Sequence, residues 1–161
     1  MMAAIPATSG ELKRERPKYV RAVGPKLRIL LYVVFALAAL LGANSIYLVS
    51  ITALEAVTDL TYQDFFYQCM FLLHLVLGLL LITPFILFGV LHLVASRNRK
   101  NKRAIRIGYA LFAISIVLLV TGVLLMRVGG FDLRHTLTRQ AVYWLHVVSP
   151  LAAVWLYWLH R

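Results

Sequence analysis

Apolar residues fill four long stretches of this chain, and most of the charged residues lie in the segments between them. The stretches cover residues 29–52, 65–95, 107–126 and 141–160, and none of them contains Asp, Glu, Lys or Arg. About 20 helical residues cross a hydrocarbon core about 30 Å thick, so each stretch is long enough to span a membrane. The pattern predicts an all-α membrane protein, a four-helix transmembrane bundle.

Composition agrees with this prediction, because 61% of the residues are hydrophobic and 14% are charged. Residues 1–28 are polar and basic, and the first apolar stretch is too long for the core of a cleaved signal peptide. We therefore expect a basic cytoplasmic tail over residues 1–28 and the bundle over residues 29–161. The net charge of +11 also suits a nucleic-acid surface, but membrane orientation explains it better, and no nucleic-acid partner is expected.

The charges between the spans predict the orientation of the helices. Seven Lys or Arg residues precede the first span, and six more lie between the second and third. The first connection carries Glu55, Asp59 and Asp64 without a base, and the third carries three Arg and one Asp. Since basic loops stay in the cytoplasm, both termini are expected there, and the second and fourth helices run from outside to inside.

Four of the five histidines lie within the spans, two on the second and two on the fourth. Ionisable groups inside a bilayer are costly, so each predicts a function. His74 and His92 are 18 positions apart, about five helical turns, and His146 and His160 are 14 apart, which leaves about 40° between them. Each pair therefore shares a helix face, and the orientation places His74 level with His146 and His92 level with His160.

Two imidazoles on facing helices suit the axial positions of six-coordinate haem iron. Cys69 is the single cysteine and no Cys-x-x-Cys-His motif occurs, so two non-covalent haem b groups are expected, an outer one at His74 and His146 and an inner one at His92 and His160. The rise of about 1.5 Å per residue separates the two pairs by about 27 Å on one helix and about 21 Å on the other. Bending at Pro84 and Pro150 is expected to absorb this difference.

Small and basic residues near the histidines complete the predicted haem sites. Gly78 and Gly89 share a face with their histidines and leave room for porphyrin, and Gly42, Gly108 and Gly122 do the same or pack helices closely. The candidate partners of the haem propionates are Arg97, Arg99, Arg127, Arg134 and Arg139, for which topogenic or solvated roles are the alternative. His135 is expected in a loop and exposed to solvent. The alternatives are that it replaces His146 as a ligand or lines an outer substrate site. Met70 and Met126 are expected to pack rather than to bind iron.

Aromatic residues gather near the expected outer membrane surface. They are Tyr62, Phe65, Phe66, Tyr67, Tyr143 and Trp144. An interfacial belt is the ordinary explanation. A quinone pocket beside the outer haem is the sharper alternative, with protons handled by Gln63, Asp64, Gln68 or His135.

The stretch "HVVSPLAAVWLYWLH", with thirteen residues between histidines, resembles the dihaem cytochromes b, including the four-helix cytochrome b subunits of bacterial respiratory dehydrogenases and hydrogenases. It is also similar to the short haem-b membrane module that precedes periplasmic multihaem domains in some bacterial cytochromes. The second helix departs from this family, because "HLVLGLLLITPFILFGVLH" has seventeen residues between histidines. The resemblance covers the four spans but not the basic tail.

The resemblance implies a multi-pass protein of the bacterial inner membrane that carries electrons between membrane quinone and a partner redox protein. The partners it implies are lipid, quinone and other subunits of an oxidoreductase complex, such as a periplasmic cytochrome or dehydrogenase. The chain is then an electron-transfer subunit, one chain of a larger redox assembly, and the sequence leaves open whether it is a fragment of a longer protein. Two alternatives remain: a haem-free membrane anchor, and a metal or proton transporter with a histidine relay.

Overall fold

Four long helices make up the described part of the chain in the computed structural model, which describes residues 24–126 and 135–161. They are α1 (Pro25–Thr58), α2 (Phe65–Ser96), α3 (Lys102–Leu125) and α4 (Thr136–His160). Each is long and apolar enough to cross a membrane. The structure confirms the predicted all-α four-helix bundle, and we describe the chain as a multi-pass membrane protein.

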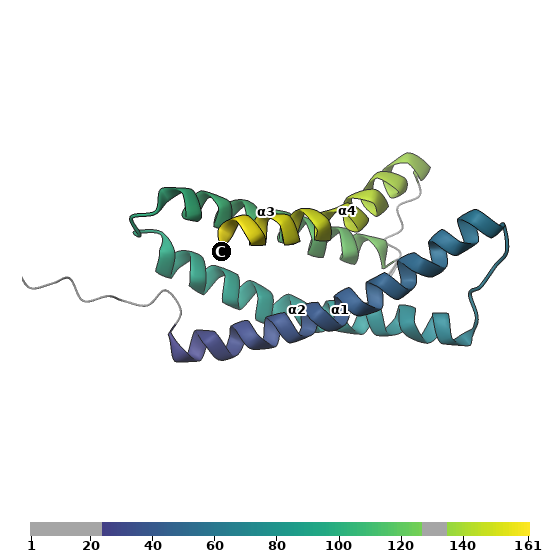
Figure 1. Ribbon diagram of the computed structural model, residues 1–161, viewed down its shortest axis with the longest axis horizontal. Helices are drawn as coiled ribbons and strands as arrows, with labels where there is room; N and C mark the ends of the chain where they lie inside the picture. The colour runs from purple at the N-terminus through teal and green to yellow at the C-terminus, as the bar shows by residue number, and fades with distance from the viewer. Residues whose placement is uncertain (1–23, 127–134) are drawn as a thin grey trace, which may run out of the picture.

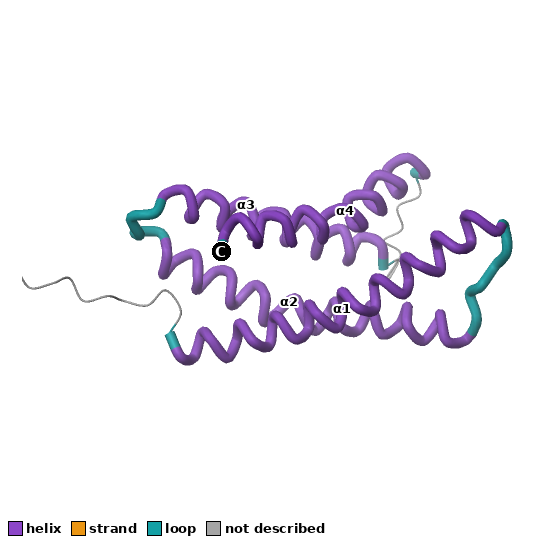
Figure 2. Tube along the Cα trace, viewed as in Figure 1, coloured by secondary structure: helices purple, strands orange, loops and turns teal. Residues whose placement is uncertain are grey.

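The helices are arranged as two hairpins that lie beside each other (Figure 1). α1 packs along α2, α3 packs along α4, and fewer contacts join α2 to α3. The connections from α1 to α2 and from α2 to α3 are short (Figure 2), so consecutive helices run in opposite directions. α2 and α4 therefore run in the same direction, as the sequence predicted.

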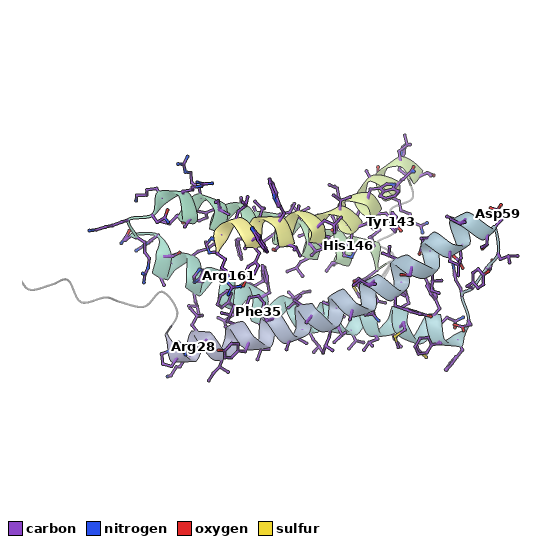
Figure 3. All side chains as sticks on the ribbon, viewed as in Figure 1. Arg28, Phe35, Asp59, Tyr143, His146 and Arg161 are labelled. Atoms are coloured by element: carbon purple, nitrogen blue, oxygen red, sulfur yellow. The ribbon has the colours of Figure 1, made fainter. Side chains whose placement is uncertain are left out.

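The two ends of the bundle differ in charge. α1 begins, α2 meets α3 and α4 ends at one end, which we call the basic end. Figure 3 shows Arg28 and Arg161 near it and Asp59 at the opposite end. The basic end also carries Arg97, Arg99, Lys100, Lys102, Arg103 and Arg106. This separation of charge is the one that orients membrane helices.

Local sequence signals explain where the helices begin and end. Pro25 occupies the first turn of α1, where its missing N–H costs nothing, so the helix starts four residues before the predicted span. The side chains of Asp64 and Asn101 cap α2 and α3 by accepting hydrogen bonds from the backbone N–H groups of Tyr67 (2.8 Å) and Ala104 (3.1 Å). α1 ends at Thr58, because the next residue, Asp59, has a left-handed backbone (φ 55°) that stops the helix.

Aromatic pairs join one hairpin to the other. Phe85 of α2 stacks on Phe112 of α3 with ring centres 5.7 Å apart, and Phe35 of α1 meets Tyr157 of α4 edge-on at 5.6 Å. The ring of Phe112 also fills the space beside Gly89, where a Cβ would overlap it. The absence of a side chain at Gly89 thus allows α2 and α3 to approach.

We predict that Gly89→Ala lowers the thermal stability of the detergent-purified protein, because the new methyl group displaces Phe112. Overpacking of this kind costs about 1–3 kcal/mol. The matched control is Gly42→Ala, since a Cβ at Gly42 meets no atom within 4 Å. Circular dichroism melting curves measure both, and equal melting temperatures for the two variants would contradict the packing role of Gly89.

Candidate functional site

The four histidines of the spans meet as two pairs, each with one ring from α2 and one from α4. The ring centres of His74 and His146 are 6.1 Å apart, and those of His92 and His160 are 6.2 Å apart. The planes of the two rings are nearly perpendicular in both pairs, at 83°. The structure thus brings together the side chains that the sequence had paired by their depth in the membrane. All four are half-buried.

The unequal spacing of the histidines does not prevent this pairing. Pro84 lies inside α2 and Pro150 inside α4, and both helices continue through them. In Figure 1, α4 changes direction along its length and α2 runs at an incline to it. An inclined helix covers less depth per residue, so the longer spacing on α2 reaches the same two levels as the shorter spacing on α4.

The separation within each pair fits one metal ion between two imidazoles. A metal–nitrogen bond of about 2 Å, added to about 1.1 Å from ring nitrogen to ring centre, places each centre about 3.1 Å from the ion. Two rings on opposite sides are then about 6.2 Å apart, close to both observed values. Among residues 24–126 and 135–161, no group of three or more His, Cys, Asp or Glu side chains could hold a metal ion.

A polar cluster on α1 holds the ring of His74. Its Nδ1 lies 3.2 Å from Asn44 Oδ1 and 3.4 Å from Ser45 Oγ. Asn44 Nδ2 donates to the carbonyl oxygen of Met70 at 3.0 Å, and this bond fixes the amide with its oxygen towards His74. Ser45 uses its own proton to donate to Leu41 O at 2.7 Å. The Nδ1 of His74 is therefore the donor, and in the neutral ring the lone pair is on Nε2.

Backbone carbonyl groups of α3 hold the two histidines of α4. His146 Nδ1 donates to Leu118 O at 3.2 Å, and His160 Nδ1 donates to Ala104 O at 3.0 Å. A carbonyl oxygen only accepts, so both rings carry the proton on Nδ1. Thr121 Oγ1, 3.3 Å from His146 Nδ1, gives a second contact to that ring.

Two glycines of α3 make these bonds possible. A Cβ on Gly122 would lie 3.0 Å from Cε1 of His146, and one on Gly108 would lie 3.0 Å from Cε1 of His160. Each glycine is four residues after the carbonyl that its histidine contacts, and a helical side chain covers the turn before it. Because glycine has no side chain, the imidazole reaches the helix backbone. The glycines thus seat the histidines, a role that the sequence had left between porphyrin clearance and helix packing.

His92 differs from the other three. Its Nδ1 is buried and has no hydrogen-bond partner within the parts of the chain that the structure describes. The ring instead stacks on Phe88, with centres 5.4 Å apart and planes 9° from parallel. Arg99, seven residues further along the chain, is half-buried.

The remaining predicted site residues have varied surroundings. A Cβ at Gly78 would meet nothing within 4 Å, so the space expected there for porphyrin is not filled by a described side chain. Beside Gly89, Phe112 occupies that space. Arg97 and Arg139 are exposed. Arg127 and Arg134 lie outside the described residues. His135 is exposed and precedes the first turn of α4 without a side-chain capping bond.

The residues suggested for proton handling have structural contacts of their own. Asp64 caps α2, and Gln63 Nε2 donates to Glu55 Oε2 at 3.1 Å. The other Glu55 oxygen accepts from the backbone N–H of Tyr62 at 2.8 Å, so Glu55 organises the connection between α1 and α2. Gln68 is exposed. Met70 contacts Asn44 through its sulfur at 3.5 Å, and Met126 follows the last turn of α3.

Comparisons with protein families, curated proteins and solved structures give no match for this chain. The site is therefore interpreted from its own geometry.

Sequence reasoning found the four rings but missed Asn44 and Thr121, two of the most buried residues, with 7% and 5% of their surface exposed. Their signal was available: each is a polar residue within an apolar span.

We predict that neutral His74, His146 and His160 carry their proton on Nδ1 in protein prepared without a cofactor. The acceptors Asn44 Oδ1, Leu118 O and Ala104 O require this tautomer. ¹⁵N NMR of histidine-labelled protein in micelles at alkaline pH measures it, with single His→Gln variants for assignment. His135, which is exposed, serves as the internal control. Protons on Nε2 of these three rings would contradict the described hydrogen bonds.

Proposed function

We propose that this protein is a dihaem b-type cytochrome subunit that transfers electrons across the membrane. The single observation that carries the proposal is the repeated pairing of imidazoles, with ring centres 6.1 and 6.2 Å apart at two levels of the bundle. Each pair offers two nitrogen donors to one metal ion. Six-coordinate haem iron needs two axial donors, because the porphyrin supplies the other four.

The hydrogen bonds at Nδ1 support the same proposal. A histidine that binds a metal almost always donates its other ring N–H to a carbonyl, carboxylate or water, which fixes the tautomer and strengthens the ligand. His74, His146 and His160 have such an acceptor. A histidine relay for protons or metal ions does not require the Nδ1 protons of these three rings to be held in this way.

In this proposal, residues of this chain would hold the cofactor and form its surroundings. His74 with His146 forms the pair towards the opposite end, and His92 with His160 forms the pair near the basic end. Leu77, which lies between His74 and His92 along α2, is a buried apolar side chain. When bound, haem supplies a one-electron iron couple whose potential depends on ligands, hydrogen bonds and burial.

The charges at the two ends of the bundle also support a location and an orientation in the membrane. Lys and Arg concentrate at the basic end, which we assign to the cytoplasm of a bacterial inner membrane, with both termini on that side. Two redox sites at two depths would connect quinone with a partner redox subunit. Arg97 and Arg99, near the inner pair, are our candidates for the propionates of that haem.

We predict that detergent-purified protein binds about two protohaem groups per chain and shows a reducible b-type spectrum. His146→Leu is expected to remove the outer haem and His160→Leu the inner one, so each halves the haem content. The matched control is His135→Leu, which should retain both, because His135 is exposed at the start of α4. The measurement is the reduced-minus-oxidised spectrum with a pyridine haemochrome assay.

The same experiment separates the competing functions. Folded protein without haem would overturn the proposal and leave a membrane anchor or a transporter. Proton or metal flux into liposomes that contain haem-free protein would then favour the transporter. One haem per chain would remove one of the two proposed sites.

We predict that Gly122→Val and Gly108→Val each lower the haem content towards one per chain. A valine at either position displaces the imidazole from its carbonyl partner, because even a Cβ would approach the ring to 3.0 Å. Gly42→Val, which adds the same side chain on α1 where a Cβ meets nothing within 4 Å, is the control and should retain both haems. Unchanged haem content in the α3 variants would contradict the seating role.

A further inference from the structure

We infer that Asn44 is a positioning residue for the outer haem, acting through the Nδ1–H of His74. This inference rests on the proposed function and adds a residue that does not touch the iron. The side chain of Asn44 is buried, although it lies within an apolar span. A buried amide needs hydrogen-bond partners, and those that Asn44 has connect α1 to α2.

The contacts of Asn44 hold both ends of its amide. Nδ2 donates to the carbonyl oxygen of Met70, one turn before His74 on the same helix, and Oδ1 accepts from the imidazole. The amide therefore cannot rotate to present its NH₂ group to the ring without losing both bonds. This arrangement sets the tautomer of His74 and leaves Nε2 for the pair with His146.

The inner pair has no equivalent of Asn44 within the described residues. His92 occupies the matching position on α2, and its Nδ1 has no acceptor in the parts of the chain described here. Phe88 stacks on its ring instead. Three of the four rings thus donate from Nδ1, two at the outer pair and one at the inner pair.

This difference in Nδ1 acceptors between the two pairs affects the reduction potentials of the two haems. An acceptor at Nδ1 makes the imidazole a stronger donor to the metal, and a stronger donor stabilises the oxidised iron. Asn44 therefore lowers the reduction potential of the outer haem. The acidic residues at that end, Glu55, Asp59 and Asp64, favour the oxidised form as well, and the bases of the basic end favour the reduced form of the inner haem.

The test is a potentiometric titration of the haem-loaded full chain, followed optically, which resolves two one-electron components. In Asn44→Leu, which nearly conserves volume but accepts no hydrogen bond, one component is expected to become easier to reduce by about tenfold in its equilibrium constant, or about 59 mV. The other component should not move. Ser50→Ala is the matched control on α1, because Ser50 is exposed and its hydroxyl donates only to Ile46 O.

A merely structural role for Asn44 would lower haem content or stability without moving one potential alone. Two haems per chain with both potentials unchanged in Asn44→Leu would overturn the inference and leave the proposed function intact. Wild-type protein without haem would overturn both. If Asn44→Leu does not assemble, Asn44→Ser replaces it, since a serine hydroxyl is too short to reach His74, and the same shift of one component is required.

Discussion

A neutral imidazole inside a bilayer has one N–H that finds no water, so its acceptor has to come from the protein, as it does for three of the four paired rings. Most of the arrangement at the centre of this molecule follows from that requirement. The acceptor for His74 is a side-chain amide, and those for His146 and His160 are carbonyl groups of α3. Because the proton of these three rings is held on Nδ1, their Nε2 keeps the lone pair. Both rings of the outer pair are of this kind, and so is one ring of the inner pair, His160.

The α3/α4 hairpin meets this requirement twice with the same local device. A helix carbonyl, a glycine four residues later and a histidine on the antiparallel helix occur together at Leu118, Gly122 and His146. They recur at Ala104, Gly108 and His160. The glycines and the histidines both repeat at 14 positions, so the register of the hairpin is set by two contacts of one kind. On the α1/α2 hairpin only His74 has an acceptor, among the residues described.

The sequence predicted the fold and the pairing of the histidines because both depend on regular geometry. Span length gave four helices, and helical spacing gave the shared faces, so that even the long interval between His74 and His92 leads to a pair. The acceptors were not predicted, since the distance from Asn44 to His74 depends on how α1 packs on α2. For the same reason the space beside Gly89 could not be assigned: it faces Phe112 of a neighbouring helix. Whether haem occupies the paired sites stays a prediction.

Few contacts cross between the hairpins compared with those inside each one. Each hairpin brings one ring to each pair, and three of the four rings are hydrogen-bonded within their own hairpin. The hydrogen bonds that hold these three rings therefore do not depend on contacts between the hairpins. Under the proposed function, a haem bound at either level would join a histidine of one hairpin to a histidine of the other, and the supply of haem to the membrane would then affect how much of the newly made chain assembles.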